Sequence, residues 1–197
     1  MLFTNAMAGR YAPELDYRGA IATAPPTQWR TTIAAVRPFA ATSPAIPNVL
    51  LVLESIRATH PDAFDPGNYL APAGAELFAQ AQSTLCFRDL AERLAGRPAT
   101  ELYDVDNSEQ ERLTRLLEHD ADIPIGRKRP PVYIAQGTAD TVVYPPASKT
   151  TAEQLAAAGT PVTFRYYPGA DHNGVLAAAQ TDLLTWAAER FTGRGRR

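Results

Sequence analysis

The sequence predicts an α/β protein in which helices flank a parallel sheet and a long helical segment interrupts the sheet. In residues 129–197, two strand-like segments alternate with two helix-like ones, an order that favours parallel strands joined by right-handed crossovers. Residues 1–26 contain a helix-like segment followed by a strand-like one. Residues 27–128 differ in texture, because Ala- and Leu-rich helical stretches alternate with proline-bearing loops. We therefore expect a core formed by residues 1–26 and 129–197, with residues 27–128 as a helical insertion.

The first two zones carry recognisable local signals. "LFTNAMAGRYA" is helix-like, and "YRGAIATAPP" is strand-like until Pro25 and Pro26 end the extended run. In the insertion, "DNSEQERLTRLLEHD" is predicted to be a helix, because Asp106 or Asn107 can cap it and acidic residues fill its first turn. This acidic cluster resembles a calcium loop only loosely, since the required glycine is missing, and helix capping explains it. The leucines expected on one helix face are Leu113, Leu116 and Leu117.

The elements of the C-terminal zone follow in order. "PVYIAQG" is a continuous apolar run closed by Gly137, which is typical of a strand buried on both faces. "PASKTTAEQLAAAG" follows as a helix that stops at Gly159. "PVTFRYYPG" alternates like a strand, with Val162, Phe164 and Tyr166 on one face. The final helix, "VLAAAQTDLLTWAAERF", offers these apolar side chains for packing: Leu176, Leu183, Leu184, Trp186 and Phe191.

Composition and charge narrow the function classes. A net charge of −2 with 20% charged residues gives no basic face for a nucleic-acid backbone, so we expect no nucleic-acid partner. No apolar run approaches the roughly 20 residues of a transmembrane segment, and "MLFTNAMAGR" lacks the pattern of a signal peptide. The single cysteine, Cys86, excludes an internal disulfide and a cysteine-based zinc site, and we expect it to be a buried thiol on a helix. His60, before Pro61, and His119, at a helix end, are expected to be structural.

Two titratable residues follow the two C-terminal strands. Asp140 lies in "GTADTVV" after the first strand, and His172 lies in "GADHNG" after the second. Catalytic groups gather outside the carboxyl ends of parallel strands, so both turns are expected at one edge of the sheet. An imidazole can act as a general base near neutral pH, and a carboxylate bonded to its far nitrogen fixes the tautomer and stabilises the imidazolium. The sequence predicts an acid–base pair, although two polar turn residues of an ordinary α/β protein are the competing interpretation.

The end segments resemble a known family. "GTADTVV", "YPGADHNGV" and "RYAPELDYRGAIATAPPTQ" are similar to segments of the α/β-hydrolases, and more narrowly of the secretory lipase family of bacteria and fungi. The middle of the chain is similar only in its character of a helical cap or lid. The resemblance implies a partial α/β-hydrolase fold, with Asp140 as triad acid and His172 as triad base. Asp171 is then a turn or helix-capping residue, although the sequence alone leaves a swap of the two aspartates open.

One motif of that family is not found in the sequence. An α/β-hydrolase presents its serine in a G-x-S-x-G turn, where a neighbouring backbone N–H helps to form the oxyanion hole. No serine lies in that pattern, and Cys86 in "TLCFRDL" has no such glycines either. The serines are Ser43, Ser55, Ser83, Ser108 and Ser148. We therefore expect the C-terminal half of a lipase, which retains acid, base and lid and is inactive without the upstream serine.

The resemblance implies a lipase or carboxylesterase that hydrolyses acylglycerols or related esters through an acyl-enzyme, with residues 27–128 as lid and acyl-binding surface. Two alternatives stay open: an α/β-hydrolase peptidase, and a non-catalytic remnant or binding module. No cofactor is expected, since a triad needs none. The resemblance also implies that the full-length parent is secreted. In the hydrolase fold that the resemblance implies, the strand in "YRGAIATAPP" pairs with the strand that carries the serine, which is missing here, so we expect self-association through an exposed sheet edge.

Overall fold

The structure of this protein is a computed structural model that describes residues 1–36, 46–126 and 130–192. The chain divides into two compact units. The first unit comprises Met1–Thr32 and Ala121–Arg197, and the second comprises Ile33–Asp120. The first unit therefore also takes in a few residues from each end of the segment 27–128 that the sequence assigns to the insertion.

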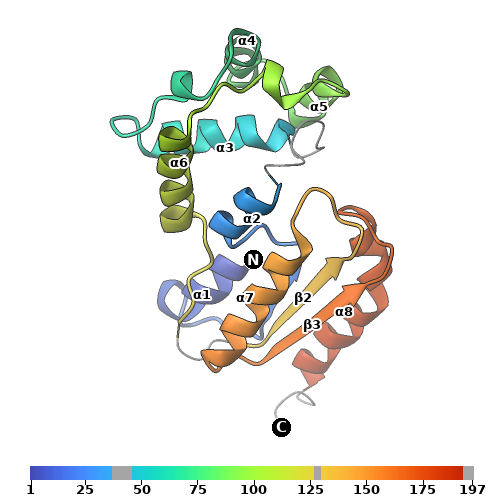
Figure 1. Cartoon of the computed structure of the whole chain (residues 1–197). Coiled ribbons are helices and arrows are strands. Elements are labelled where there is room, and N and C mark those ends of the chain that lie inside the picture. The colour runs from blue at the N-terminus through green and yellow to red at the C-terminus, as the bar shows by residue number, and fades with distance from the viewer. Residues whose placement is uncertain (37–45, 127–129, 193–197) are drawn as a thin grey trace. The chain divides into compact units, whose positions relative to one another are not determined.

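A three-stranded parallel sheet forms the centre of the first unit (Figure 1). Its strands are β1 (Ala20–Thr23), β2 (Val132–Gly137) and β3 (Val162–Tyr167), in the order β1-β2-β3. The register pairs Ala20 with Val132 and Val132 with Val162. Every residue of β2 is buried, as its apolar run predicts for a central strand. The predicted α/β class, with parallel strands and flanking helices, is confirmed.

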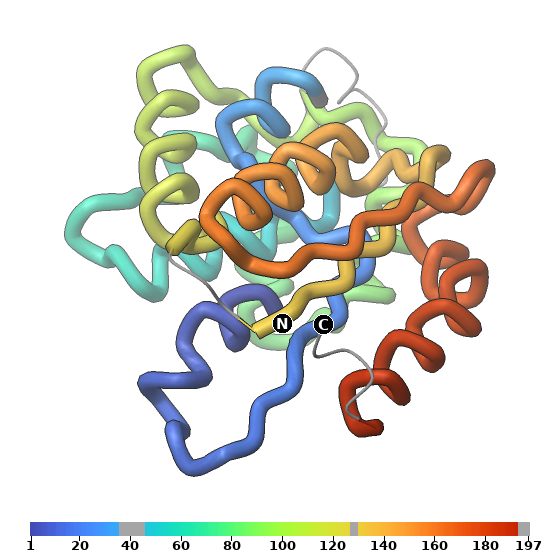
Figure 2. Tube along the Cα trace, turned by 90° about the horizontal axis from the view of Figure 1, so that it is seen from below, coloured from blue at the N-terminus to red at the C-terminus, as the bar shows by residue number. Residues whose placement is uncertain are grey.

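Helices cover both faces of this sheet. On one face, α1 (Leu2–Tyr11) and α7 (Pro145–Ala157) pack on β2, where Leu2 and Leu155 join Ile134 in one apolar cluster. On the other face, α8 (Gly174–Thr192) packs with Ala179 near Tyr133. Figure 2 shows α7 and α8 on opposite sides of the strands. Another helix, α2 (Trp29–Val36), follows β1 along the chain.

The turn and face signals of the C-terminal zone are confirmed. Helix α7 ends at Ala157, and Gly159 has a φ of +88°, a left-handed conformation that glycine adopts without steric cost. Val162 and Phe164 of β3 pack on the cluster shared with α1 and α7. The ring of Tyr166 lies edge-on to Phe164, with 4.8 Å between the ring centroids. The three alternating residues of β3 therefore share one face, as predicted.

The predicted packing of α8 is right for two apolar side chains and wrong for three. Leu183 and Trp186 are each only 8% exposed and belong to the core between α8 and the sheet. Leu176, Leu184 and Phe191 are 60%, 64% and 78% exposed. A helix packs on a sheet with one stripe of its surface, and Leu184 and Phe191 lie outside the stripe that contains Leu183 and Trp186. Leu176 lies at the edge of this stripe, in the first turn of the helix.

The second unit is helical. Its elements are α3 (Ile46–Thr59), η2 (Pro66–Asn68), α4 (Pro72–Ala81), α5 (Phe87–Leu94), η3 (Ala99–Glu101) and α6 (Asn107–Asp120). Leu50, Leu53 and Leu102 are all 0% exposed and lie in its core. At Gly74, a Cβ atom would lie 2.0 Å from the carbonyl oxygen of Leu102, so α4 approaches that backbone more closely than any side chain would allow.

Helix α6 begins as the sequence predicts. The Asp106 carboxylate accepts hydrogen bonds from the backbone N–H groups of Ser108 and Glu109, at 2.7 and 2.9 Å, and so caps the helix. Leu113 and Leu117 are buried, and Leu116 is partly buried. Over the described parts of the chain, none of the helices combines the length and the apolarity that a bilayer span requires.

Candidate active site

The two predicted site residues meet at the carboxyl end of the sheet. Asp140 lies in the turn between β2 and α7, and His172 lies in the turn between β3 and α8. Since β2 and β3 are adjacent and parallel, both turns leave the sheet at the same end. The Nδ1 atom of His172 lies 2.9 Å from Oδ2 of Asp140.

Backbone contacts hold the two turns together. The N–H of Thr138 donates to Tyr167 O at 3.1 Å, and the N–H of Ala139 donates to Ala170 O at 3.0 Å. The hydroxyl oxygen of Thr138 accepts from the N–H of Gly169 at 2.9 Å. A Cβ atom on Gly137 would lie 2.3 Å from Ala170 O, so only glycine permits this approach. The position of the acid relative to the base is therefore built into the backbone.

Four donors surround the carboxylate of Asp140, whose side chain is fully buried. Its Oδ1 accepts from the N–H groups of Val142 and Val143, both at 2.9 Å. Its Oδ2 accepts from Gln136 Nε2 at 3.0 Å as well as from His172 Nδ1. An ionised carboxylate can only accept, so this surrounding suits a buried negative charge.

His172 is oriented for general-base chemistry. Because an ionised Asp140 can only accept, Nδ1 of His172 carries a proton and donates it in the hydrogen bond to Oδ2, and the neutral ring then has its lone pair on Nε2. The side chain of His172 is 34% exposed, so the ring is open to solvent while its partner is not. A buried acid behind a partly exposed imidazole can accept a proton at Nε2 and stabilise the resulting imidazolium.

Asp171, the neighbour of the base, contacts a different partner. Its Oδ1 accepts from the N–H of Gly174 at 2.6 Å, at the start of α8. This is the helix-capping geometry, whereas Asp140 contacts the imidazole. The alternative that the sequence left open, a swap of the two aspartates, has no geometric support.

In the described part of the chain, no serine or cysteine side chain forms a hydrogen bond with His172. Ser148 is fully buried in α7, and Ser55, Ser83 and Ser108 are exposed on the second unit. Ser43 lies outside the described residues. Cys86 is exposed at the start of α5, where its thiol donates to Asp89 Oδ2 at 3.0 Å, so the expected buried thiol is wrong. Cys86 is the N-cap of α5 and forms a capping box with Asp89, so its side chain is engaged at the end of the helix and not on its buried face.

The other two histidines share one carboxylate in the second unit. His60 Nε2 contacts Asp120 Oδ2, and His119 Nδ1 lies 2.6 Å from Asp120 Oδ1. The hydrogen bonds from His119 and His60 lower the pKa of Asp120. Across the described residues, no group of three or more His, Cys, Asp or Glu side chains could hold a metal ion.

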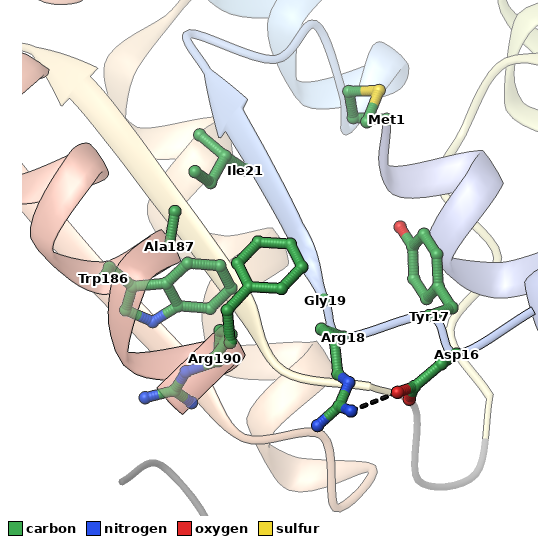
Figure 3. Close-up of a pocket in the computed structure, with 10 residues that line it drawn as sticks. Met1, Asp16, Tyr17, Arg18, Gly19, Ile21, Trp186, Ala187 and Arg190 are labelled. Carbon is green, nitrogen blue, oxygen red and sulfur yellow. Dashed lines mark hydrogen bonds and ion pairs between the residues drawn. The ribbon is translucent and has the colours of Figure 1, made fainter. Parts of the chain in front are cut away.

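A shallow pocket of about 370 Å³ lies at the other end of the first unit (Figure 3). Tyr17 and Gly19, just before β1, form one wall, and Trp186 and Phe191 in the last turns of α8 form another. Burial raises the pKa of Tyr17. None of these residues follows the carboxyl end of a strand, so the pocket is separate from the Asp140–His172 pair.

Sequence reasoning missed two polar groups behind the site. Gln136 and Ser148 are both fully buried, and Gln136 contacts Asp140 directly. The available signal was a glutamine inside the apolar run "VYIAQG", where a polar side chain needs a buried partner. The partner was not readable, because β2 and α7 meet only in the folded unit.

Known proteins resemble this chain in structure, whereas the two comparisons by sequence found no match. No family model matches the chain, and no curated protein matches it. Among solved structures, lipase A of Candida antarctica in its closed state has a TM-score of 0.76 at 19% identity, over 98% of this chain and 46% of that chain. The rice cell wall degrading esterase LipA of Xanthomonas oryzae has a TM-score of 0.68 at 10% identity, over 94% of this chain and 52% of that chain.

A third structure, described as a hydrolase of Legionella pneumophila, has a TM-score of 0.72 at 13% identity and covers 100% of this chain. The match covers 53% of the Legionella chain. The present chain therefore spans about half the length of the structures that it resembles. The chain therefore has part of a lipase-like fold of the α/β-hydrolase type. At these identities the likeness establishes the fold alone.

Proposed function

We propose that the chain carries the acid and the base of a serine ester hydrolase of the lipase and carboxylesterase class. The observation that carries the proposal is the 2.9 Å hydrogen bond between buried Asp140 and partly exposed His172, at the ends of adjacent parallel strands. The lipase-like fold supports the same class, because such folds hold their catalytic groups at this end of the sheet.

In the proposed reaction, His172 Nε2 takes the proton of a serine hydroxyl as the serine oxygen bonds to the carbonyl carbon of the ester. The imidazolium then returns the proton to the leaving alcohol as the C–O bond breaks, which leaves an acyl-enzyme. The same imidazole deprotonates a water molecule, and the attack of that water releases the carboxylic acid and restores the serine. Asp140 holds the ring in position and stabilises the imidazolium in both halves.

The serine and the oxyanion donors of this reaction would come from polypeptide outside the 197 residues. The serine closest to the pair along the chain, Ser148, cannot serve, because its buried hydroxyl donates to Gln136. We therefore expect residues 1–197 to be inactive by themselves.

The second unit is the proposed cap. It is helical, and it exposes apolar side chains, with Val49, Leu51 and Phe87 at 37%, 39% and 48%. Such a surface suits the acyl chain of an ester, so we propose acylglycerols and related apolar esters as substrates. By the resemblance to secretory lipases, we also propose that the full-length parent is exported.

The test uses the longer reading frame. The DNA upstream of the Met1 codon is read for an in-frame G-x-S-x-G, and the encoded protein is assayed with a p-nitrophenyl ester. We expect His172→Ala and Asp140→Asn each to lower turnover by on the order of 10⁴-fold. Asp171→Asn is the matched control, because it changes the adjacent carboxylate without touching the pair.

Two results would overturn the proposal: turnover that survives His172→Ala, and ester hydrolysis by residues 1–197 alone. A protein that cleaves peptides and leaves esters intact would instead establish the peptidase alternative. The absence of any upstream G-x-S-x-G motif would favour the non-catalytic remnant.

A further inference from the structure

Two buried polar side chains lie next to the carboxylate of the acid–base pair. Gln136 in β2 and Ser148 in α7 are both 0% exposed. Ser148 Oγ donates to Gln136 Oε1 at 2.7 Å, and Gln136 Nε2 donates to Asp140 Oδ2 at 3.0 Å. Hydrogen bonds therefore run without interruption from α7 through β2 to Asp140, and on to His172.

The neighbours of the Gln136 amide fix its orientation. Its Nε2 faces two groups that can only accept, Asp140 Oδ2 and the carbonyl oxygen of Gly137, at 3.0 and 3.2 Å. If the amide were turned over, its oxygen would face both acceptors in a buried space, which is unfavourable. Ser148 supplies the donor that Oε1 requires. The serine hydroxyl thus selects the orientation in which the amide donates to the acid.

Burying a glutamine at this position is unfavourable unless hydrogen-bond partners replace the water that its amide loses. All other residues of β2 from Val132 to Ala135 are apolar or aromatic, and an aliphatic side chain would suit the same core. The amide also shares an acceptor atom with the base, because Asp140 Oδ2 receives both Gln136 Nε2 and His172 Nδ1. The glutamine amide therefore interacts directly with the negative charge of Asp140.

We propose that Gln136, oriented by Ser148, is a positioning residue for the Asp140–His172 pair. While Val142 and Val143 hold Oδ1, the amide keeps Oδ2 directed at the imidazole and shares its negative charge. Asp140 then stabilises the imidazolium less strongly than it would without this donor, which favours the return of the proton to the leaving group. The inference rests on the proposed function, since it gives a role to a group that acts through the acid.

The experiment reads each histidine separately in residues 1–197. Diethyl pyrocarbonate modifies neutral imidazole, so the extent of modification rises with pH as each histidine loses its proton. Peptide mass spectrometry measures this extent at each histidine and gives the pH at which modification is half-maximal, the midpoint. Submicromolar protein limits association during the measurement. His60 and His119 lie in the second unit and serve as internal references. Two carboxylates lie next to His172: Asp140, which contacts its ring, and Asp171, its neighbour along the chain, which accepts a hydrogen bond from the N–H of Gly174.

Gln136→Met keeps a similar volume and removes both polar ends of the side chain. We expect the His172 midpoint to rise by about half a pH unit, because Oδ2 loses a competing donor and stabilises the imidazolium better. Ser148→Ala should shift it in the same direction by less. Thr151→Val is the matched control, since it deletes another buried hydroxyl of α7, one that bonds to Thr27. It should leave the midpoint unchanged.

Asp140→Asn separates this inference from the proposed function, because it removes the carboxylate and should lower the His172 midpoint. If Asp140→Asn lowers the midpoint while Gln136→Met and Ser148→Ala leave it unchanged, the positioning role is overturned and the pair stands. If Asp140→Asn changes nothing, the pair itself is overturned. Equal shifts at His60 and His119 would show a global change and would also contradict the positioning role. Ser148→Ala carries the test if Gln136→Met does not fold.

Discussion

Two groups of buried polar atoms at opposite ends of the sheet in the first unit differ in how completely they are hydrogen-bonded. At the carboxyl end, the buried Asp140 carboxylate accepts two hydrogen bonds on each oxygen. At the other end, Tyr17 Oη and Arg190 Nε are buried without a hydrogen-bond partner among the described residues. There, too, Phe191 is 78% exposed beside the pocket of Figure 3.

The sheet has two edge strands. β2 pairs with a strand on each side, whereas β1 and β3 each pair, among the described residues, with β2 alone. An unpaired edge next to exposed apolar side chains is a template for association. Exposed apolar side chains lie at the end of α8, close to the start of β1, so we expect this surface to be the one through which the chain associates.

The largest expected effect is association through that surface. Leaving several hundred Å² of apolar surface exposed, at about 25 cal/mol per Å², forfeits on the order of 10 kcal/mol. We expect residues 1–197 to be aggregated at micromolar concentration in light scattering, and Phe191→Glu to reduce the aggregation. Phe87→Glu is the matched control, because it adds the same charge at an exposed phenylalanine of the second unit. A monodisperse monomer with a cooperative thermal transition would contradict this expectation.

A smaller effect separates the two faces of α8. Trp186→Ala should cost about 3–5 kcal/mol of unfolding free energy, because the indole is 8% exposed and packs near Tyr133 with 6.0 Å between ring centroids. Phe191→Ala should change the stability by less than about 0.5 kcal/mol, because its ring is in solvent. Urea unfolding at submicromolar concentration, followed by tyrosine and tryptophan fluorescence, measures both. Equal losses would show that Phe191 is covered in solution.

The smallest of these effects concerns the carboxyl end. Gly137→Ala would place a Cβ atom 2.3 Å from Ala170 O, so the two turns must separate at a cost of about 1–3 kcal/mol. Gly9→Ala is the control, because no atom lies within 4 Å of its added Cβ and alanine favours the helix by about 0.5–1 kcal/mol. The same urea measurement applies. Wild-type stability of Gly137→Ala would show that the turns are not locked together.

Part of this site was readable from the sequence. The turns of Asp140 and His172 follow strands that apolar runs and helix boundaries reveal, and the rule that parallel strands end at one edge brings the turns together. Their partner atoms could not be read, because Asp140 and His172 are 32 positions apart and Asp171 is adjacent to the base. Topology and the family resemblance favoured Asp140 while leaving Asp171 open, and the structure places the Asp140 carboxylate at the imidazole. The catalytic roles of the pair stay a prediction.

The sequence by itself determined what depends on neighbours along the chain: the buried run of β2, the cap of α6 at Asp106, and the glycine stop after α7. Periodicity and capping act within a few residues, so they survive without tertiary information. Only the tertiary structure decided which stripe of α8 is covered, and that Ser148 meets Gln136 across 12 positions. Burial and buried hydrogen bonds depend on segments that meet in space, and no local pattern in either segment records the other.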